Sequence, residues 1–321
     1  MDRGLAPAEH AQRAARYAVI FRTHFWDAFT SRQMQRLRER VHNGDIYVVV
    51  DETSGPIAGI DHDRVMGVTE AQMSELGLPL RGANALDWYG PYSLMWFNGD
   101  YALYAFLSAH PDYDYYVQLE YDVVLHTDVD EIVARCEKEQ ADFVGLTRGE
   151  PVETWAWRHT CADAYGSSEI LYKLICFCIF SRRALRHLFQ RRLALATSLR
   201  PDQGWPFCEG FIATEVAITG MNSPELTDFV DTSSYDTWPP VLEADLPSLA
   251  HAHVIHPVLD QPRYISSVLK WKVGLSGYLN PASLLHRKLR RLPTRDYVQT
   301  LASSFAAKAR RTLRQRGILR G

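Results

Sequence analysis

The stretch Tyr113-Asp-Tyr-Tyr-Val-Gln-Leu-Glu120-Tyr-Asp122 decides the fold class. It is an aromatic and aliphatic run, typical of a buried strand, that ends in two carboxylates two positions apart. Side chains two positions apart on a strand point the same way, so Glu120 and Asp122 share a face at the carboxyl end. In open α/β sheets, ligands bind at that end. Two oxygen donors there suit Mg²⁺ or Mn²⁺ bridging to a diphosphate.

Strand-like and helix-like segments alternate on both sides of this stretch. Further strands are expected at residues 17–21, 45–51, 142–146 and 171–180. Helices are expected from Thr30 or Ser31 to about 42, over 100–109 with Asn98 as cap, from Asp128 to 139, and over 183–191 after Ser181. Residues 54–82 read as loop with one short helix near 70–75. The alternation predicts βαβ units and a mostly parallel, Rossmann-type sheet flanked by helices.

Length and composition favour one large folded region. The chain has 321 residues, of which 46% are apolar, and this excludes global disorder. We expect a flexible lead-in over residues 1–16, a catalytic domain over 17–280 and a basic helical tail over 281–321.

The charge is distributed unevenly. Residues 281–321 hold 11 Lys and Arg and one acid, which gives a local charge of +10. Because the net charge of the whole chain is −3, the remaining residues carry a charge of −13. A basic amphipathic tail binds anionic membrane surfaces or nucleic acid, or stays solvated, and these alternatives remain open for the tail. Because the rest of the chain is acidic, we expect no nucleic-acid substrate.

The cysteines and the N-terminus argue for a cytoplasmic protein. Five cysteines without regular spacing indicate no disulfide framework. The N-terminus shows no signal peptide, and no run approaches the roughly 18 apolar residues of a membrane span.

Three further motifs are candidates for chemistry. Cys208-Glu-Gly-Phe-Ile-Ala-Thr-Glu215 places Glu209 before a helix-like apolar run; Glu209, or Glu215 as second candidate, is a potential base for an acceptor hydroxyl. Its alternative role is to cap that helix. His256 follows Val254-Ile255, and a neutral imidazole there can complete an oxygen-rich metal site, although a lone His is more often structural. Asp61-His62-Asp63 lies among glycines and is better explained as a loop.

Taken together, residues 17–270 resemble the GT-A glycosyltransferase superfamily. The resemblance rests on the opening strand with Arg22 and Thr23, on Asp51 after the second strand, and on Glu120-Tyr-Asp122 in the place of the Asp-x-Asp metal motif. Glu209 matches the acid that opens a late helix, and His256 matches a late metal-binding His. The motifs are short, so the resemblance is at superfamily level.

The resemblance implies an enzyme that transfers a sugar from a nucleotide-diphosphate sugar to a hydroxyl acceptor, a glycan or a lipid-linked glycan. Mn²⁺ or Mg²⁺ is implied as cofactor, bound by Glu120, Asp122 and His256. The implied nucleotide-binding residues are Arg22, Thr23, Asp51, Asn98, Asp100 and Glu120, and the acceptor base is Glu209 or Glu215. A lipid-linked acceptor would agree with a basic tail that holds the enzyme at the membrane surface.

Two other functions remain open. A sugar-1-phosphate nucleotidyltransferase shares the layout, but it is expected to carry a glycine-rich loop after the first strand, and Phe21-Arg-Thr-His-Phe-Trp26 has no glycine. A non-catalytic carbohydrate-binding or scaffold protein would explain why Glu replaces the first Asp of the metal motif.

Overall fold

The computed structural model describes residues 14–81, 94–166, 170–270, 280–283, 286, 287, 290 and 298. Most of the predicted lead-in and basic tail lies outside these residues. The described chain divides into two compact units. The first unit holds residues up to 27, 38–120 and 128–229, and the second holds 28–37, 121–127 and the residues from 230 onward.

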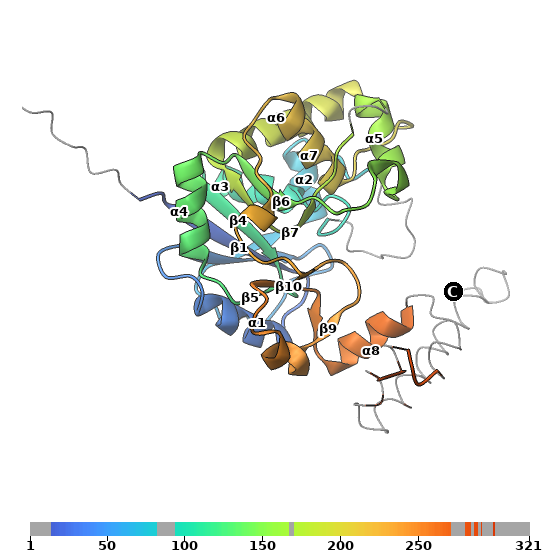
Figure 1. The fold of residues 1–321 in the computed structure, drawn as a ribbon. Helices are drawn as coiled ribbons and strands as arrows, with labels where there is room; N and C mark the ends of the chain where they lie inside the picture. The colour runs from blue at the N-terminus through green and yellow to red at the C-terminus, as the bar shows by residue number, and fades with distance from the viewer. Residues whose placement is uncertain are drawn as a thin grey trace, which may run out of the picture. The chain divides into compact units, whose positions relative to one another are not determined.

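A six-stranded sheet in the order β3-β2-β1-β4-β7-β6 forms the centre of the first unit (Figure 1). β3, β2, β1 and β4 run parallel, and β7 is antiparallel to both of its neighbours. The strands are β1 (Tyr17–Thr23), β2 (Asp45–Asp51), β3 (Val65–Val68), β4 (Tyr115–Glu120), β6 (Phe143–Leu146) and β7 (Leu174–Ser181). This sheet confirms the predicted mixed α/β class with a mostly parallel sheet flanked by helices.

Helices cover both faces of this sheet. The helices of the first unit are α2 (Glu70–Glu75), α3 (Tyr101–Ala109), α4 (Val129–Glu139), α5 (Arg158–Tyr165), α6 (Arg182–Ser198) and α7 (Cys208–Ile218), with short 3-10 turns η2 (Val152–Thr154) and η3 (Leu226–Asp228). α2, α3, α6 and α7 share one buried cluster with Ala18, Ile20 and Tyr116. Tyr115 points to the other face, where its hydroxyl donates to the Cys136 carbonyl of α4 at 3.0 Å. The alternation along β4 therefore separates two helical layers.

Local sequence signals set several of these boundaries. Asp128 caps α4 by accepting from the Asp130 amide at 2.8 Å, and Ser181 caps α6 by accepting from the Ala184 amide at 3.1 Å. α4 also carries acids in its first turn and Lys138 in its last turn, as the helix dipole favours. The Asp128 cap, the bounds of β2, the short helix α2 and the presence of a helix after Ser181 confirm the predictions from sequence, and α6 extends beyond the expected 183–191 to Ser198.

Other boundaries differ from the predictions. The helix expected to start at Thr30 or Ser31 is α1 (Ala28–Arg38), and it begins earlier because the buried Phe29 joins its first turn. β3 was not expected, because its Val-Met-Gly-Val sequence is short and it forms only by pairing with β2. α3 has Asp100 rather than Asn98 at its N-cap, with no hydrogen bond from the cap side chain.

The second unit consists of short elements. They are α1, β5 (Val124–Leu125), β8 (Ser234–Tyr235), β9 (Val241–Leu242), η4 (Glu243–Leu249), β10 (Val254–His256), β11 (Val258–Leu259) and α8 (Gln261–Lys270). One sheet has the order β5-β10-β8, and β11 pairs with β9. Arg32 and Arg36 of α1 both bind the Glu243 carboxylate, with contacts of 2.7 Å, and this fastens η4 to α1.

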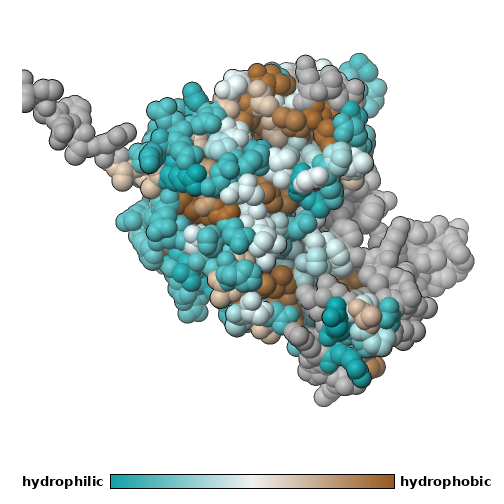
Figure 2. All heavy atoms as spheres, viewed as in Figure 1, coloured by the Kyte–Doolittle hydropathy of each residue, from teal (hydrophilic) through white to brown (hydrophobic). Residues whose placement is uncertain are grey.

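Apolar side chains are mostly inside. In the face shown in Figure 2, hydrophilic residues predominate and the hydrophobic areas are small and separate. Among the described residues no helix is long and apolar enough to cross a membrane.

Candidate active site

The carboxyl edge of the parallel strands gathers four of the predicted residues in the first unit. β1 ends in Arg22 and Thr23, and β4 ends in Glu120. The register places Arg22 directly beside Glu120, and on the other side of β1 it places Thr23 beside Val50, the residue before Asp51. Because parallel strands end at the same edge, these residues meet although the sequence separates them widely.

Arg22 is buried and holds Glu120. Its side chain is 2% exposed, and one Nη lies 2.6 Å from Glu120 Oε1, whose side chain is 27% exposed. The other Nη donates to the Gly99 carbonyl. The Nε of Arg22 is buried without a hydrogen-bond partner among the residues that the structure describes. A buried N–H without an acceptor is unfavourable, so a ligand oxygen at this position would be stabilised.

Thr23 and Asp51 make local contacts. The Thr23 hydroxyl donates to the Phe25 carbonyl at 2.7 Å, which shapes the turn after β1. Asp51 is buried and accepts from the Thr53 amide at 2.9 Å. This hydrogen bond closes a turn typical of Asp and occupies one oxygen of the Asp51 carboxylate, which remains at the edge of the sheet.

Glu209 lies in the first turn of α7 and is partly buried. Burial and the nearby Glu120 carboxylate raise the pKa of Glu209 to about 8 from an ordinary 4.5, while Arg148 opposes the rise only in part. The shift requires Glu209 and Glu120 to lie within electrostatic range. The two carboxyl groups therefore differ in their surroundings: Glu120 pairs with Arg22, whereas Glu209 lies where burial and the nearby Glu120 raise its pKa.

Glu215 is enclosed by contacts within the first unit. It is 1% exposed, accepts from the Tyr165 hydroxyl at 2.8 Å and lies 2.9 Å from Arg191. These contacts tie α7 to α5 and α6. Its predicted role as a catalytic base stays a prediction.

Asn98 and Asp100 are fully buried and bonded within the fold. Asp100 forms an ion pair with Arg192, with contacts of 2.6 and 3.2 Å, and Asn98 accepts from Trp205 Nε1 at 3.1 Å. Both lie in the segment that presents the Gly99 carbonyl to Arg22. Nucleotide binding by these two residues stays a prediction, and their contacts indicate a structural role.

Asp122 and His256 come together in the second unit. Asp122 Oδ1 and His256 Nε2 are 3.6 Å apart, and His256 Nδ1 lies 2.6 Å from the Asp236 carbonyl. A carbonyl only accepts, so Nδ1 carries a hydrogen, and a ring with that single hydrogen presents the Nε2 lone pair beside the carboxylate. A carboxylate oxygen and an imidazole nitrogen at this spacing fit Mn²⁺ or Mg²⁺.

Comparisons with known proteins identify no family. No family model matches the chain, and no curated protein matches it. Among solved structures, it is similar to a glycosyltransferase involved in the glycosylation of the major capsid of PBCV-1, with a TM-score of 0.39 and 8% identity over 75% of this chain and 94% of that one. It is also similar to the galactosyltransferase LgtC in complex with donor and acceptor sugar analogues, with a TM-score of 0.41 and 10% identity over 74% of this chain and 86% of that one.

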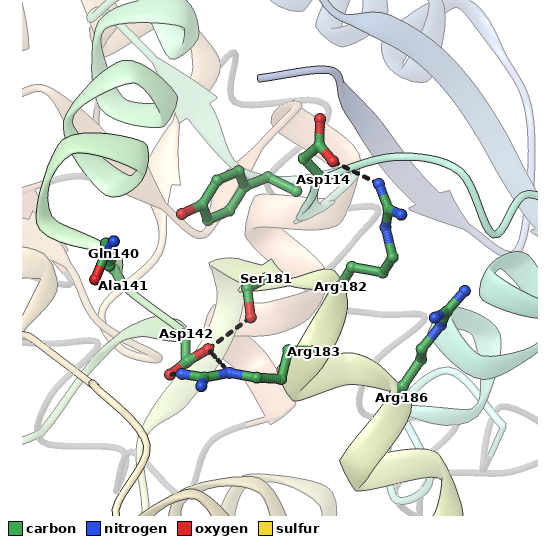
Figure 3. Close-up of a pocket in the computed structure, with 9 residues that line it drawn as sticks. Asp114, Gln140, Ala141, Asp142, Ser181, Arg182, Arg183 and Arg186 are labelled. Atoms are coloured by element: carbon green, nitrogen blue, oxygen red, sulfur yellow. Dashed lines mark hydrogen bonds and ion pairs between the residues drawn. The ribbon is translucent and has the colours of Figure 1, made fainter. Parts of the chain in front are cut away.

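A cavity of about 550 Å³ lies elsewhere in the first unit, at the amino ends of β4 and β6 (Figure 3). Arg182 pairs there with Asp114, and Arg183 with Asp142. Tyr115 starts β4 and Glu120 ends it, so the cavity is at the opposite edge of the sheet from the candidate site. None of the predicted site residues lines it.

Sequence reasoning missed Arg148 and Gly99. Arg148 follows the carboxyl end of β6 and acts on Glu209. The sequence signal that could have identified Arg148 was its position just after a buried strand. The role of Gly99 had no sequence signal, because it depends on a carbonyl that meets Arg22 from 77 residues away.

Proposed function

We propose that the protein is a glycosyltransferase that moves a sugar from a nucleotide-diphosphate sugar to a hydroxyl group. The observation that carries the proposal is the arrangement in the first unit: Glu209, with a pKa of about 8, lies near Glu120, which is paired with Arg22 at the carboxyl edge of a parallel sheet. One carboxyl group is held by a buried arginine, and the other, with its raised pKa, is poised to exchange a proton near neutral pH.

The donor nucleotide would lie along the ends of β1 and β2. Arg22, Thr23 and Asp51 are its proposed contacts, and the buried Arg22 Nε supplies a donor for a phosphate or carbonyl oxygen. Asn98 and Asp100 would act behind this surface, through the Gly99 carbonyl that they hold in place.

The proposed metal ligands are Asp122 and His256, with Glu120, two residues before Asp122, as the third. A bound divalent cation would neutralise the charge that develops on the diphosphate leaving group. The chain's own contribution is to fix the His256 ring through Asp236 and so keep Nε2 available.

Glu209 is the proposed acceptor base. In an inverting transfer, the acceptor oxygen forms a bond to the sugar's anomeric carbon while the bond from that carbon to the diphosphate oxygen breaks. The electron pair of the breaking bond leaves with the diphosphate, and the hydroxyl proton moves to Glu209. Glu215 is the second candidate for this base. In a retaining transfer no such base is needed, and Glu209 would position the acceptor instead.

The acceptor we propose is a glycan or lipid-linked glycan, and the tail over 281–321, with its local charge of +10, would hold the enzyme at an anionic membrane surface. Flotation with vesicles that contain phosphatidylserine tests this. Deletion of 281–321 should abolish binding; a truncated protein that still floats with the vesicles would refute the role of the tail.

The test of the function is a thermal shift of the purified protein with a panel of nucleoside diphosphates, each with and without Mn²⁺. A metal-dependent rise in Tm with one nucleotide, absent in Asp122→Ala, supports the transferase and identifies the base of the donor. Release of nucleoside diphosphate from the matching sugar donor then confirms turnover. A well-folded protein without any shift would favour a non-catalytic carbohydrate-binding protein, in which Arg22 simply neutralises Glu120.

A further inference from the structure

Residues 96–100, called here the bridging segment, contact the supports of both carboxyl groups of the candidate site. On one side, the Gly99 carbonyl accepts from Arg22, whose other Nη binds Glu120 at 2.6 Å. On the other side, the Phe97 carbonyl accepts from the Cys208 amide at 3.2 Å, and the Trp96 carbonyl accepts from the Cys208 thiol at 3.3 Å. Cys208 is the first residue of α7 and directly precedes Glu209.

A buried arginine fastens this segment. Arg192 and Asp100 are both 0% exposed, and their ion pair has contacts of 2.6 and 3.2 Å. The Tyr104 hydroxyl adds a bond to Asp100 at 3.0 Å. Although burial lowers it, the neighbouring Asp100 raises the pKa of Arg192 above its ordinary value, so the guanidinium stays charged. A fully enclosed pair with these bonds has one favourable geometry.

The same arginine reaches the start of α7. Arg192 Nη1 donates to the Pro206 carbonyl at 3.0 Å, two residues before Cys208. Trp205, next to Pro206, donates to Asn98 of the bridging segment at 3.1 Å. Three bonds therefore join the segment directly to the residues at the start of α7, namely the Trp205–Asn98 bond and the two bonds of Cys208. Arg192 of α6 adds a fourth link, because it binds both Asp100 and the Pro206 carbonyl.

There is little free space at the contact with Arg22. A Cβ added to Gly99 would lie 3.0 Å from Arg22 Nη1 and 3.3 Å from the Met95 and Trp96 carbonyls. A shift of the segment is therefore passed directly to Arg22, and through it to Glu120.

From these contacts we propose that Arg192 and Asp100 are positioning residues: through the bridging segment they fix Glu120 and Glu209 relative to each other. Neither touches the carboxyl groups, and both act through Arg22 and Cys208. The catalytic consequence rests on the proposed function, whereas the mechanical link stands without it.

The link is tested by the reactivity of the Cys208 thiol, which needs no activity. Cys208 is buried and its pKa is raised well above the ordinary value by burial, so alkylation requires local opening. In Asp100→Asn, site-resolved mass spectrometry after iodoacetamide should show Cys208 labelled about tenfold faster than in wild type, since loss of a charged hydrogen bond weakens the local structure. Cys136, a buried residue of α4 itself, should keep its rate and serves as internal reference.

Asp142→Asn is the matched control. Asp142 is a buried carboxylate with an arginine partner, Arg183, but it lies at the opposite edge of the sheet. This variant should lower the overall stability without a selective change at Cys208. If Asp100→Asn does not fold, Trp205→Phe removes the bond to Asn98 without leaving a buried unpaired charge, and it should also accelerate Cys208 selectively.

The catalytic part is tested by steady-state kinetics with the donor found in the thermal-shift panel. Asp100→Asn should lower kcat about tenfold and change the donor KM less than about twofold, because the misplaced groups act in the transition state. Unchanged Cys208 labelling in folded Asp100→Asn and Trp205→Phe would overturn the mechanical link. Accelerated labelling with unchanged kcat would overturn the catalytic part. Accelerated Cys208 labelling in Asp100→Asn, together with no turnover by the wild-type protein, would support the link and count against the transferase.

Discussion

Replacement of Glu209 by glutamine should make the protein more resistant to alkaline pH. The folded protein holds the Glu209 proton up to a pKa of about 8, whereas an unfolded chain releases it near the ordinary 4.5. Between these values the folded state binds more protons, so stability falls as pH rises and is greatest below pH 4.5. Glutamine fits the same space and does not titrate.

The magnitude follows from the two pKa values. With 4.5 and about 8, the raised pKa of Glu209 destabilises the folded state relative to the unfolded chain by about 2 kcal/mol at pH 6 and about 5 kcal/mol at pH 9. The free energy of unfolding of wild type should therefore drop by about 2 to 3 kcal/mol more than that of Glu209→Gln between these two pH values. All other titrating groups are common to both proteins and cancel in the difference.

Urea denaturation at pH 6 and pH 9 measures this difference, with equal m-values as the check that both proteins unfold alike. Equal pH dependence of the two proteins would refute the reasoning, because it would mean that Glu209 titrates as an ordinary solvent-exposed acid. The same titration should appear in catalysis if Glu209 is the base. At pH 7 about a tenth of Glu209 is ionised, so kcat/KM should rise about tenfold from pH 7 to its plateau above pH 9 and lose this dependence in Glu209→Gln.

Three further changes test the site and its packing. Arg22→Met removes two charged hydrogen bonds and should lower the free energy of unfolding by roughly 2 kcal/mol in urea and abolish the nucleotide-induced thermal shift; an unchanged shift would exclude Arg22 from the nucleotide site. Asp122→Ala should lose the Mn²⁺-dependent rise in Tm. Asp63→Ala, which changes the Asp-x-Asp sequence at 61–63 in a loop, should keep it. The reverse result would place the metal site at that loop. Gly210→Ala would place a Cβ 2.7 Å from the Cys161 sulfur, so thermal unfolding should show a loss of about 1 to 3 kcal/mol, and a wild-type Tm would show that α7 is more loosely packed than described.

The sequence by itself determined the elements whose signals are local. The run ending in Glu120-Tyr-Asp122 predicted β4, although the strand ends at Glu120 and Asp122 lies in the turn that follows. Asp128 marked the start of α4 as its cap, and a helix was expected after Ser181, where α6 begins. Their bonds join residues two or three positions apart, so they form from the local chain. The alternation of such elements is also sufficient to predict a mostly parallel sheet.

Only the tertiary structure decided which side chains meet and in what state. The Arg22–Glu120 pair spans 98 residues, and the Asp100–Arg192 pair spans 92, so no local pattern specifies either partner. The resemblance implied Asp100 as a nucleotide contact, which stays a prediction, and only the structure shows that a buried arginine from α6 pairs with it. The raised pKa of Glu209 depends on burial and on Glu120, which lies on a different strand. Desolvation and long-range charge arise from packing, and a sequence read residue by residue contains neither.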